Sequence, residues 1–317
     1  MKIRLGYVAL SLTLTDTSYC HTMTYSKFQK LSPEEAQQRL HQILTQNLKN
    51  FQTILKYNYQ NKIEFFRFSP TIVPLATHPK VNFDYLTPYQ KEWSKIGKLI
   101  TKYQIRVDTH PDQYCILNSK NPHIVNNSIN ILKYHQTLFK AMNIKSQIIL
   151  HIGAKYDSKK ESIDRFIHNF TNLPQKIKKL IILENDDKIY NIKDTLTICQ
   201  KLNIPMVLDY HHYKCNNEKE KIEDYLSQIF ATWKNTGLPP KIHFSSPKSH
   251  SNPRAHSDYI NYQDFIKFIK ILSTYSQDID IMLECKAKDE ALFRLIRQLK
   301  IYSPFTIKNN SIIIKKD

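Results

Sequence analysis

The chain has 317 residues, of which 41% are hydrophobic and 23% are charged, and its formal net charge is +18. This composition is typical of a soluble globular protein, and the length is comfortable for a β/α barrel of roughly 250 residues. No apolar run approaches the roughly 20 residues that span a bilayer, and Ser and Thr interrupt the apolar N-terminal stretch, so neither a membrane span nor a signal peptide is expected.

The positive charge favours a polyanionic partner, because Lys and Arg side chains that bind phosphates release condensed counterions, which favours binding. A coding bias toward Lys, Asn, Ile and Tyr is the alternative explanation, and no dense Lys/Arg block marks a tail. The cysteines are Cys20, Cys115, Cys199, Cys215 and Cys285. Their odd number, wide spacing and lack of a CxxC motif predict reduced thiols in a cytoplasmic protein.

Strand-like and helical segments alternate along the chain. Short runs rich in Ile, Val, Leu and Phe predict buried parallel strands over residues 2–7, 64–69, 105–110, 147–153, 180–186, 205–212, 241–247 and 280–286. Amphipathic segments predict helices over residues 33–59, 88–103, 122–142, 158–170, 193–202, 219–235, 259–275 and 289–300. Ser32 and Glu35 open the first helix at the spacing of a capping box.

Eight strand–helix pairs predict a single (β/α)8 TIM barrel over residues 1–300, with its active site at the C-terminal ends of the strands. Residues 301–317 are expected to form a C-terminal extension, in which SIIIKK can add a short strand or remain loose. A doubly wound sheet is the alternative fold. The four glycines form no phosphate-binding fingerprint, which argues against its dinucleotide-binding version.

Six consecutive predicted strands carry an imidazole or a carboxylate toward their ends. These residues are His110, His151, Glu184, Asp209, His243 and Glu284, and either His211 or His212 adds an imidazole after Asp209. Because barrel active sites lie where the strands end, the side chains are expected to meet at one face. A lone strand histidine is usually structural. Clustered carboxylates in a barrel mouth, however, repel one another and are costly to desolvate without cations.

The predicted ligand set contains nitrogen and oxygen donors and no thiolate. Such a set suits manganese, zinc or iron, and oxygen-rich positions also suit magnesium. The donors exceed the needs of one ion, so two or three divalent ions are expected. Closely spaced ions can activate water and stabilise the leaving oxygen of a phosphoryl displacement. With the basic composition, this favours phosphodiester hydrolysis.

A lysine is predicted on the same strand face as one of these histidines. Lys241 and His243 are two residues apart on a strand, so they point to the same side. A buried lysine is costly unless it is paired or neutralised. Either Glu184 or Glu284 is the expected ionic partner.

A series of motifs runs in order from the N-terminus to about Lys300. The motifs are LGY (5–7), FRFS (66–69), VPLATHP (73–79), HPDQY (110–114), HIG (151–153), LENDDK (183–188), DYHH (209–212), KIHFSSPK (241–248), RAHSDY (254–259) and MLECKAKD (282–289). Together they resemble those of the ultraviolet-damage endonuclease family. LENDDK and KIHFSSPK in sequence are fairly specific, whereas HIG alone is not.

This resemblance implies a DNA repair endonuclease with a barrel similar to endonuclease IV and a trinuclear metal cluster, often manganese. It implies ATP-independent incision of the phosphodiester immediately 5′ to cyclobutane pyrimidine dimers, 6-4 photoproducts and some abasic sites. The implied partner is double-stranded DNA containing ultraviolet lesions, and the protein is expected to be a monomer that is not bound to a membrane.

The resemblance also implies roles for individual residues. By this likeness one metal is held by His110, His151 and Glu184. Glu184 bridges to a second metal, which Asp209, His243 and Glu284 also hold. A third metal is held by His212 and His256, and His78 matches another ligand position. Glu184, Lys241 and His243 form the implied catalytic set, and Lys241 matches a lysine that is carboxylated in part of the family.

The remaining implied contacts are with DNA. Gln113 and Tyr114 match the pair that enters the base stack at the lesion, and Tyr7 matches an aromatic residue near the flipped bases. Some family members have an asparagine where this chain has Leu10 and Ser11. The contact from the first loop is therefore not carried over.

Three other functions are compatible with parts of this pattern. An apurinic endonuclease of the endonuclease IV type has the same barrel and a similar set of metal ligands, but the Gln113–Tyr114 pair favours the ultraviolet-damage hypothesis. A metal-dependent sugar isomerase would not need a strongly basic surface. A DNA-binding protein with a decayed site would not retain the full set of ligands.

Overall fold

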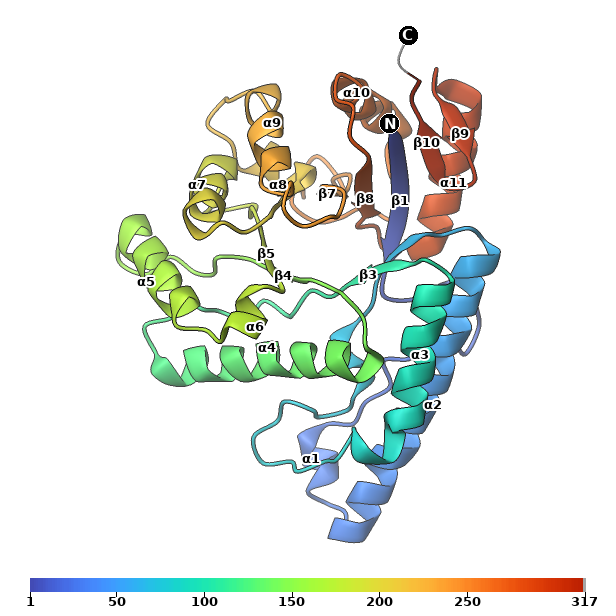
Figure 1. The fold of residues 1–317 in the computed structure, drawn as a ribbon, viewed down its shortest axis with the longest axis vertical. Coiled ribbons are helices and arrows are strands. Elements are labelled where there is room, and N and C mark those ends of the chain that lie inside the picture. The colour runs from blue at the N-terminus through green and yellow to red at the C-terminus, as the bar shows by residue number, and fades with distance from the viewer. Residues whose placement is uncertain (316–317) are drawn as a thin grey trace.

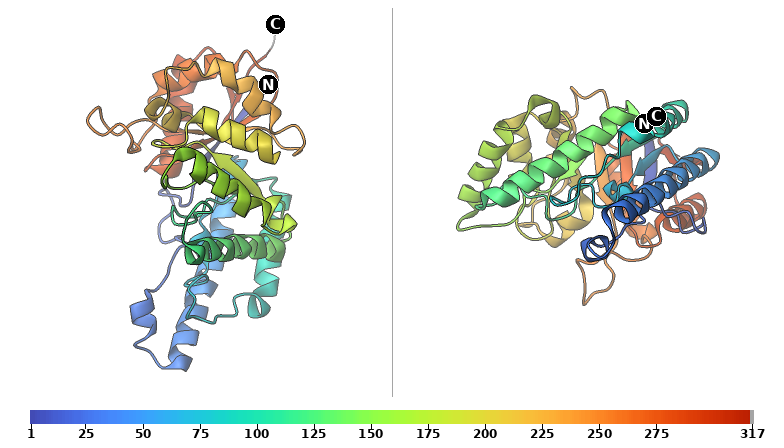
Figure 2. Two further views of the ribbon diagram at one scale, coloured as in Figure 1. Left: turned by 90° about the vertical axis from the view of Figure 1, so that its left-hand side faces the viewer. Right: turned by 90° about the horizontal axis from the view of Figure 1, so that it is seen from below.

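The computed structural model describes residues 1–315, which fold into a barrel of eight parallel strands surrounded by helices (Figure 1 and Figure 2). The strands are β1 (Lys2–Val8), β2 (Phe65–Arg67), β3 (Arg106–Asp108), β4 (Ile148–Leu150), β5 (Ile181–Glu184), β6 (Met206–Asp209), β7 (Lys241–Phe244) and β8 (Ile279–Leu283). The predicted (β/α)8 TIM barrel is confirmed, and the strand bounds exceed the predicted ranges by one residue at most.

The strands follow the order β3-β2-β1-β8-β7-β6-β5-β4, so only the seam between β3 and β4 remains to close the barrel. Thr109 closes it through a parallel bridge to Ile148. The Thr109 amide donates to the Gln147 carbonyl at 3.1 Å, and the Ile149 amide donates to the Thr109 carbonyl at 3.0 Å. The closing residue therefore directly precedes His110.

Helices cover the outside of the barrel. They are α1 (Tyr25–Phe28), α2 (Pro33–Gln60), α3 (Gln90–Lys102), α4 (Pro122–Met142), α5 (Lys159–Thr171), α6 (Gln175–Lys178), α7 (Ile192–Leu202), α8 (Tyr210–Cys215), α9 (Glu223–Ala231), α10 (Tyr262–Leu272) and α11 (Lys288–Tyr302). The capping box of Ser32 and Glu35 is present at the start of α2. No described helix is both long enough and apolar enough to cross a membrane.

Several predicted elements are shorter in the structure, and two of these differences have a clear structural cause. The helix predicted over residues 219–235 begins only at Glu223, because Lys219 has a φ of 71°, which a right-handed helix cannot contain. The strand predicted over 205–212 ends at Asp209, whose side chain accepts a hydrogen bond from the His212 amide and so caps the short helix α8. His211 and His212 therefore lie on a helix.

Strand alternation divides the side chains between the barrel interior and the helices. Ile149, Ile182 and Val207 lie two residues before His151, Glu184 and Asp209, so they share the interior face, where they cluster with Trp233. The apolar residues at the intervening positions pack outward into the main core. The interior thus combines an apolar layer with the polar ends of the strands.

The lower part of the interior also contains charged residues. Asp280 accepts hydrogen bonds from Arg4 Nε at 2.5 Å and from Arg106 Nη1 at 2.6 Å. The Arg106 guanidinium lies over the Trp233 ring, 5.2 Å from its centroid. These contacts lie at the N-terminal ends of the strands, away from the predicted site.

A C-terminal hairpin packs against the first strand. A hairpin of β9 (Thr306–Lys308) and β10 (Ser311–Ile313) follows α11, and β10 pairs antiparallel with the first half of β1. Strand β2 pairs only with the last residues of β1, so the hairpin occupies the edge that β2 leaves open. SIIIKK, for which both a short strand and a loose end were open, contributes strand β10.

Candidate metal centre

The C-terminal ends of the strands, called the mouth below, bring the predicted ligands together in two groups. His110, His151 and Glu184 form the first group, and Glu184, Asp209, His243 and Glu284 form the second; within each group, one ligand atom per residue lies within 4.8 Å of the others. Residues from six consecutive strands thus meet as expected, and Glu184 belongs to both groups.

The two carboxylate oxygens of Glu184 face different groups. Oε2 lies 3.1 Å from His110 Nε2 and 3.8 Å from His151 Nε2. Oε1 lies 2.9 Å from His243 Nδ1 and 3.5 Å from His212 Nδ1. This geometry lets one carboxylate bridge two cations.

The helix α8 separates the roles of its two histidines. His212 faces the carboxylates, with Nδ1 3.7 Å from Asp209 Oδ2 and 2.9 Å from the Asn185 carbonyl. His211 Nε2 instead lies 3.2 Å from the Arg254 carbonyl. His256 Nδ1 lies 3.9 Å from Glu284 Oε2. His212 and His256 therefore border the second group, whereas His211 supports the loop that carries Arg254.

Two predicted residues are not brought to these groups. The His78 ring stacks on Tyr25, with ring centroids 4.0 Å apart, and Lys80 donates its amide to His78 Nδ1. Tyr7 is fully buried against Phe66, and its hydroxyl donates to Asn58 Oδ1 at 2.7 Å. Its side chain offers no exposed surface to DNA.

The prediction that Lys241 pairs with Glu184 or Glu284 is wrong. Lys241 is fully buried, and its ionic partner is Asp108, whose Oδ2 lies 2.5 Å from Lys241 Nζ. Burial lowers the pKa of Lys241 to about 7, against the opposing effect of Asp108. Asp108 lies on β3 with its side chain inside the barrel, two residues before His110 and on the same face.

Arg67 is a second residue that sequence reasoning missed. Its guanidinium, buried inside the barrel, contacts Asp108, Glu284 and His243. The only sequence signal was the position of Arg67 between the apolar residues Phe66 and Phe68 of the predicted strand. A buried arginine is expected to have a partner, but the partner becomes evident only once β2 and β3 are in register.

The crowding of carboxylates perturbs several pKa values. Burial raises the pKa of Asp209 to about 7, and the charges of Glu184 and Glu284 add to this effect. Burial opposes ionisation of Glu184, but the surrounding histidines, His243 first, together with the hydrogen bonds from His110 and His243, outweigh it and hold the pKa of Glu184 well below its ordinary range. The pKa of His212 rises to about 9 because Asp209 and Glu184 outweigh its burial. The buried carboxylates of the mouth therefore need hydrogen-bond donors or cations beside them to stay ionised.

The donor set fits divalent ions. No donor within residues 1–315 makes a hydrogen bond to the buried Oδ2 of Asp209, and the buried Nδ1 of His151 likewise has no hydrogen-bond partner among those residues. A buried polar atom without a partner is costly, and Asp209 Oδ2 lies among the ligands of the second group. Imidazole nitrogens with carboxylate oxygens are ligands typical of manganese, zinc and iron.

The loop after β3 presents the predicted lesion-binding pair. Gln113 is exposed, and 72% of Tyr114 is exposed. Tyr114 also borders a cavity of about 250 Å³ together with Thr71, Pro111 and His135. The tyrosine therefore stands beside the mouth and does not pack into the rim of the barrel.

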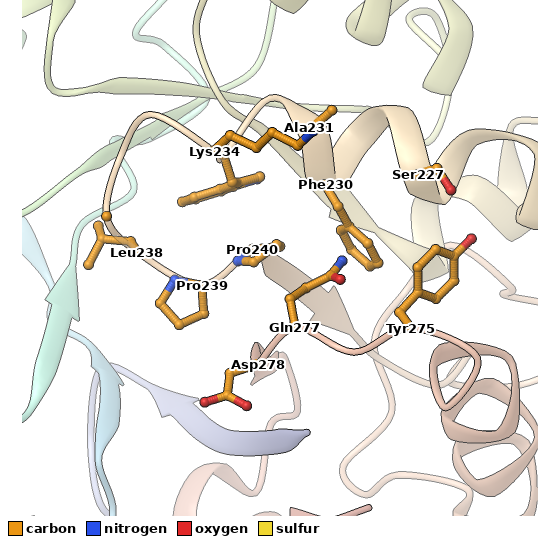
Figure 3. Close-up of a pocket in the computed structure, with 12 residues that line it drawn as sticks. Ser227, Phe230, Ala231, Lys234, Leu238, Pro239, Pro240, Tyr275, Gln277 and Asp278 are labelled. Carbon is orange, nitrogen blue, oxygen red and sulfur yellow. The ribbon is translucent and has the colours of Figure 1, made fainter. Parts of the chain in front are cut away.

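An apolar cavity of about 410 Å³ lies at the other end of the strands (Figure 3). Phe230, Tyr275 and Pro240 line it, and Pro240 directly precedes β7. The metal-ligand groups lie at the opposite ends of the same strands. This cavity is therefore separate from the candidate site.

Comparison with known proteins identifies close relatives. The family model of the UV-endonuclease UvdE matches residues 3–313. A UV DNA damage endonuclease of Bacillus cereus (strain B4264) is 44% identical over 301 residues, covering 94% of this chain and 95% of the relative. A protein of the same name from Bacillus thuringiensis subsp. konkukian (strain 97-27) is 42% identical with the same coverage.

Solved structures agree at the level of the fold. The crystal structure of SacUVDE has a TM-score of 0.85 and 34% identity, covering 94% of this chain and 98% of that chain. Endonuclease IV from Thermus thermophilus and a 3-keto-D-glucoside 4-epimerase from E. coli both reach a TM-score of 0.56, at 10% and 8% identity, and each comparison covers 94% of this chain and 99% of the other. A nuclease and a sugar epimerase thus share this barrel, so the fold alone does not assign the chemistry.

Proposed function

Because this chain belongs to the UV-endonuclease UvdE family, we propose that it is a metal-dependent DNA repair endonuclease that cuts immediately 5′ to ultraviolet photoproducts. Its proposed lesions are cyclobutane pyrimidine dimers, 6-4 photoproducts and abasic sites, incised without ATP. The single observation that carries the proposal is the placement of Glu184 between two ligand groups at the barrel mouth. The net charge of +18 suits a nucleic-acid substrate.

We propose two or three divalent ions, with manganese first and zinc, magnesium or iron as alternatives. His110, His151 and Glu184 hold one; Glu184, Asp209, His243 and Glu284 hold a second; His212 and His256 hold a third. Such ions supply Lewis-acid stabilisation of the charge that develops on a phosphate during hydrolysis. A ligand role for His78 remains a prediction, since its ring stacks on Tyr25.

The protein residues supply position and shape. Glu184 fixes the distance between the two ligand groups, and the exposed pair Gln113 and Tyr114 stands beside them to meet the base stack. Figure 1 shows α1 and the start of α2 extending beyond the C-terminal end of β1. We expect a cytoplasmic monomer that acts on double-stranded DNA.

The test is incision of a duplex with one defined lesion. The protein is incubated with Mn²⁺ and duplexes bearing a cyclobutane dimer, a 6-4 photoproduct, an abasic site or no lesion, and each nick is mapped. A nick directly 5′ to the photoproducts supports the proposal. Incision at the abasic site alone indicates an apurinic endonuclease. Binding without incision indicates a DNA-binding protein, and neither binding nor incision leaves a sugar isomerase.

Lys241 is proposed as a catalytic residue in a carboxylated form. The Lys241 ammonium first loses a proton; the neutral amine then adds CO₂ and releases a second proton, which leaves an anionic carbamate oxygen donor two residues before His243 on the same strand. The expected result is an intact mass, measured at neutral pH, that exceeds the sequence mass by one CO₂. Lys241→Met should lose this mass and lower incision. An unmodified lysine in well-resolved experimental density would contradict it.

A further inference from the structure

Arg67 contacts two members of the second ligand group, His243 and Glu284. It lies on β2 with 8% of its surface exposed, and its guanidinium reaches into the mouth from below. Nη1 donates to Glu284 Oε1 at 2.6 Å, Nη2 contacts His243 Nε2 at 2.5 Å, and Nε donates to Asp108 Oδ1 at 3.2 Å. A fixed positive charge is thus built into the proposed metal site.

The contact with His243 determines which ring nitrogen carries the proton. A guanidinium has only donors, so His243 Nε2 must accept from Arg67. A neutral imidazole has one acceptor nitrogen, and Nδ1 must then carry the proton that it donates to Glu184 Oε1 at 2.9 Å. Both nitrogens of His243 are therefore engaged.

A histidine that binds a metal needs a different partner at one of these two nitrogens. A histidine that binds a metal through one nitrogen donates its other N–H to a carboxylate, a carbonyl or water. Arg67 cannot accept that hydrogen bond. If a metal takes Nε2, it displaces Arg67 directly; if it takes Nδ1, the proton moves to Nε2 and faces the guanidinium N–H.

We propose that Arg67 competes with a metal ion for His243 and Glu284, so that loading of the second group requires the guanidinium to release His243. The inference rests on the proposed metal site and adds a residue that lowers its affinity. Asp108 anchors the other edge of the guanidinium, so Arg67 keeps a partner after it releases His243. Arg67 is a positioning residue that holds the carboxylates together and sets a threshold for metal binding.

The test measures Mn²⁺ binding by calorimetry in wild type, Arg67→Met and Arg67→Lys, together with unfolding in EDTA. Methionine keeps a long side chain without charge or donors. Because a nearby unit charge is removed, Arg67→Met should bind Mn²⁺ about tenfold more tightly or better and should unfold at a lower temperature in EDTA. The melting temperature should consequently rise more on adding Mn²⁺ than it does in wild type.

Arg106→Met is the matched control. Arg106 is also an interior arginine paired with an aspartate, but its partner Asp280 lies at the opposite end of the strands. This variant should lose stability in EDTA while its Mn²⁺ affinity stays at the wild-type value. A loss of stability alone therefore does not mimic the effect expected for Arg67.

The outcomes separate the inference from the proposed function. Unchanged or weaker Mn²⁺ binding by Arg67→Met overturns the competition. If that variant does not fold, Arg67→Lys becomes the test. Its single ammonium group cannot reproduce the three guanidinium contacts with Asp108, Glu284 and His243, so it should release His243 and bind Mn²⁺ more tightly than wild type, by less than Arg67→Met because the charge is kept. Unchanged or weaker binding by Arg67→Lys overturns the inference. No Mn²⁺ binding by wild type overturns the proposed metal site itself.

Discussion

Glu184→Gln is expected to reduce incision of photoproduct-containing duplex by about 10³-fold or more, since several kcal/mol of charge stabilisation depends on the bridged ions. The amide retains the size of the side chain but cannot offer an anionic oxygen to both ligand groups. Metal analysis should show fewer ions bound per chain, while circular dichroism should remain that of wild type. EDTA should abolish wild-type incision, and Mn²⁺ should restore it.

Glu64→Gln is a suitable control for this substitution. Glu64 pairs with Lys2 near the start of β2 and is partly exposed. Loss of an exposed ion pair changes stability by about 1 kcal/mol at most, so incision and metal content should not change. Full incision by Glu184→Gln, or by EDTA-treated wild type, would refute the multinuclear site.

The double change Gln113→Ala, Tyr114→Ala is expected to lower incision of dimer-containing duplex by about 10²-fold, because an inserted side chain offsets an unstacking cost of a few kcal/mol per step. A dimer is already poorly stacked, so opening the helix there costs less than at an intact site. The variant should therefore also lose much of the wild-type preference for damaged over undamaged DNA, measured as a ratio of dissociation constants.

Metal content and thermal stability should not change in this double variant. Tyr114 is 72% exposed, so its removal leaves no cavity, and surface substitutions change stability by about 0.5 kcal/mol. Tyr302→Ala, which removes a tyrosine that is 59% exposed at the end of α11, is the control and should incise like wild type. Unchanged discrimination in the double variant would place lesion recognition elsewhere.

The positions of the strands and of the candidate ligands could be predicted because both depend on local pattern. A buried parallel strand is a short apolar run, and a polar residue at its end must lie at the mouth of the barrel. This reasoning brought Glu184 together with His110 and His243. The start of α8 could not be predicted in this way, since Asp209 ends a strand and caps a helix at once.

The missed residues depend on partners far along the chain. Asp108 and Lys241 are separated by 133 positions, and Arg67 reaches His243 across 176. Which charge meets which depends on how β2, β3 and β7 are placed around the barrel. Because Lys241 was predicted to share a strand face with His243, a carboxylate of the same predicted ligand set, Glu184 or Glu284, was the expected partner of Lys241. The interior of the barrel instead provides Asp108.

The hairpin on β1 has a practical consequence for single-molecule and surface-based measurements. The Met1 amine donates to the Ile314 carbonyl at 3.0 Å, and β1 begins at the end of the barrel opposite the mouth (Figure 1 and Figure 2). A linker attached at Met1 would therefore start from the end of the barrel that faces away from the proposed DNA site. Immobilised on a sensor through such a linker, every molecule would present its mouth to the solution.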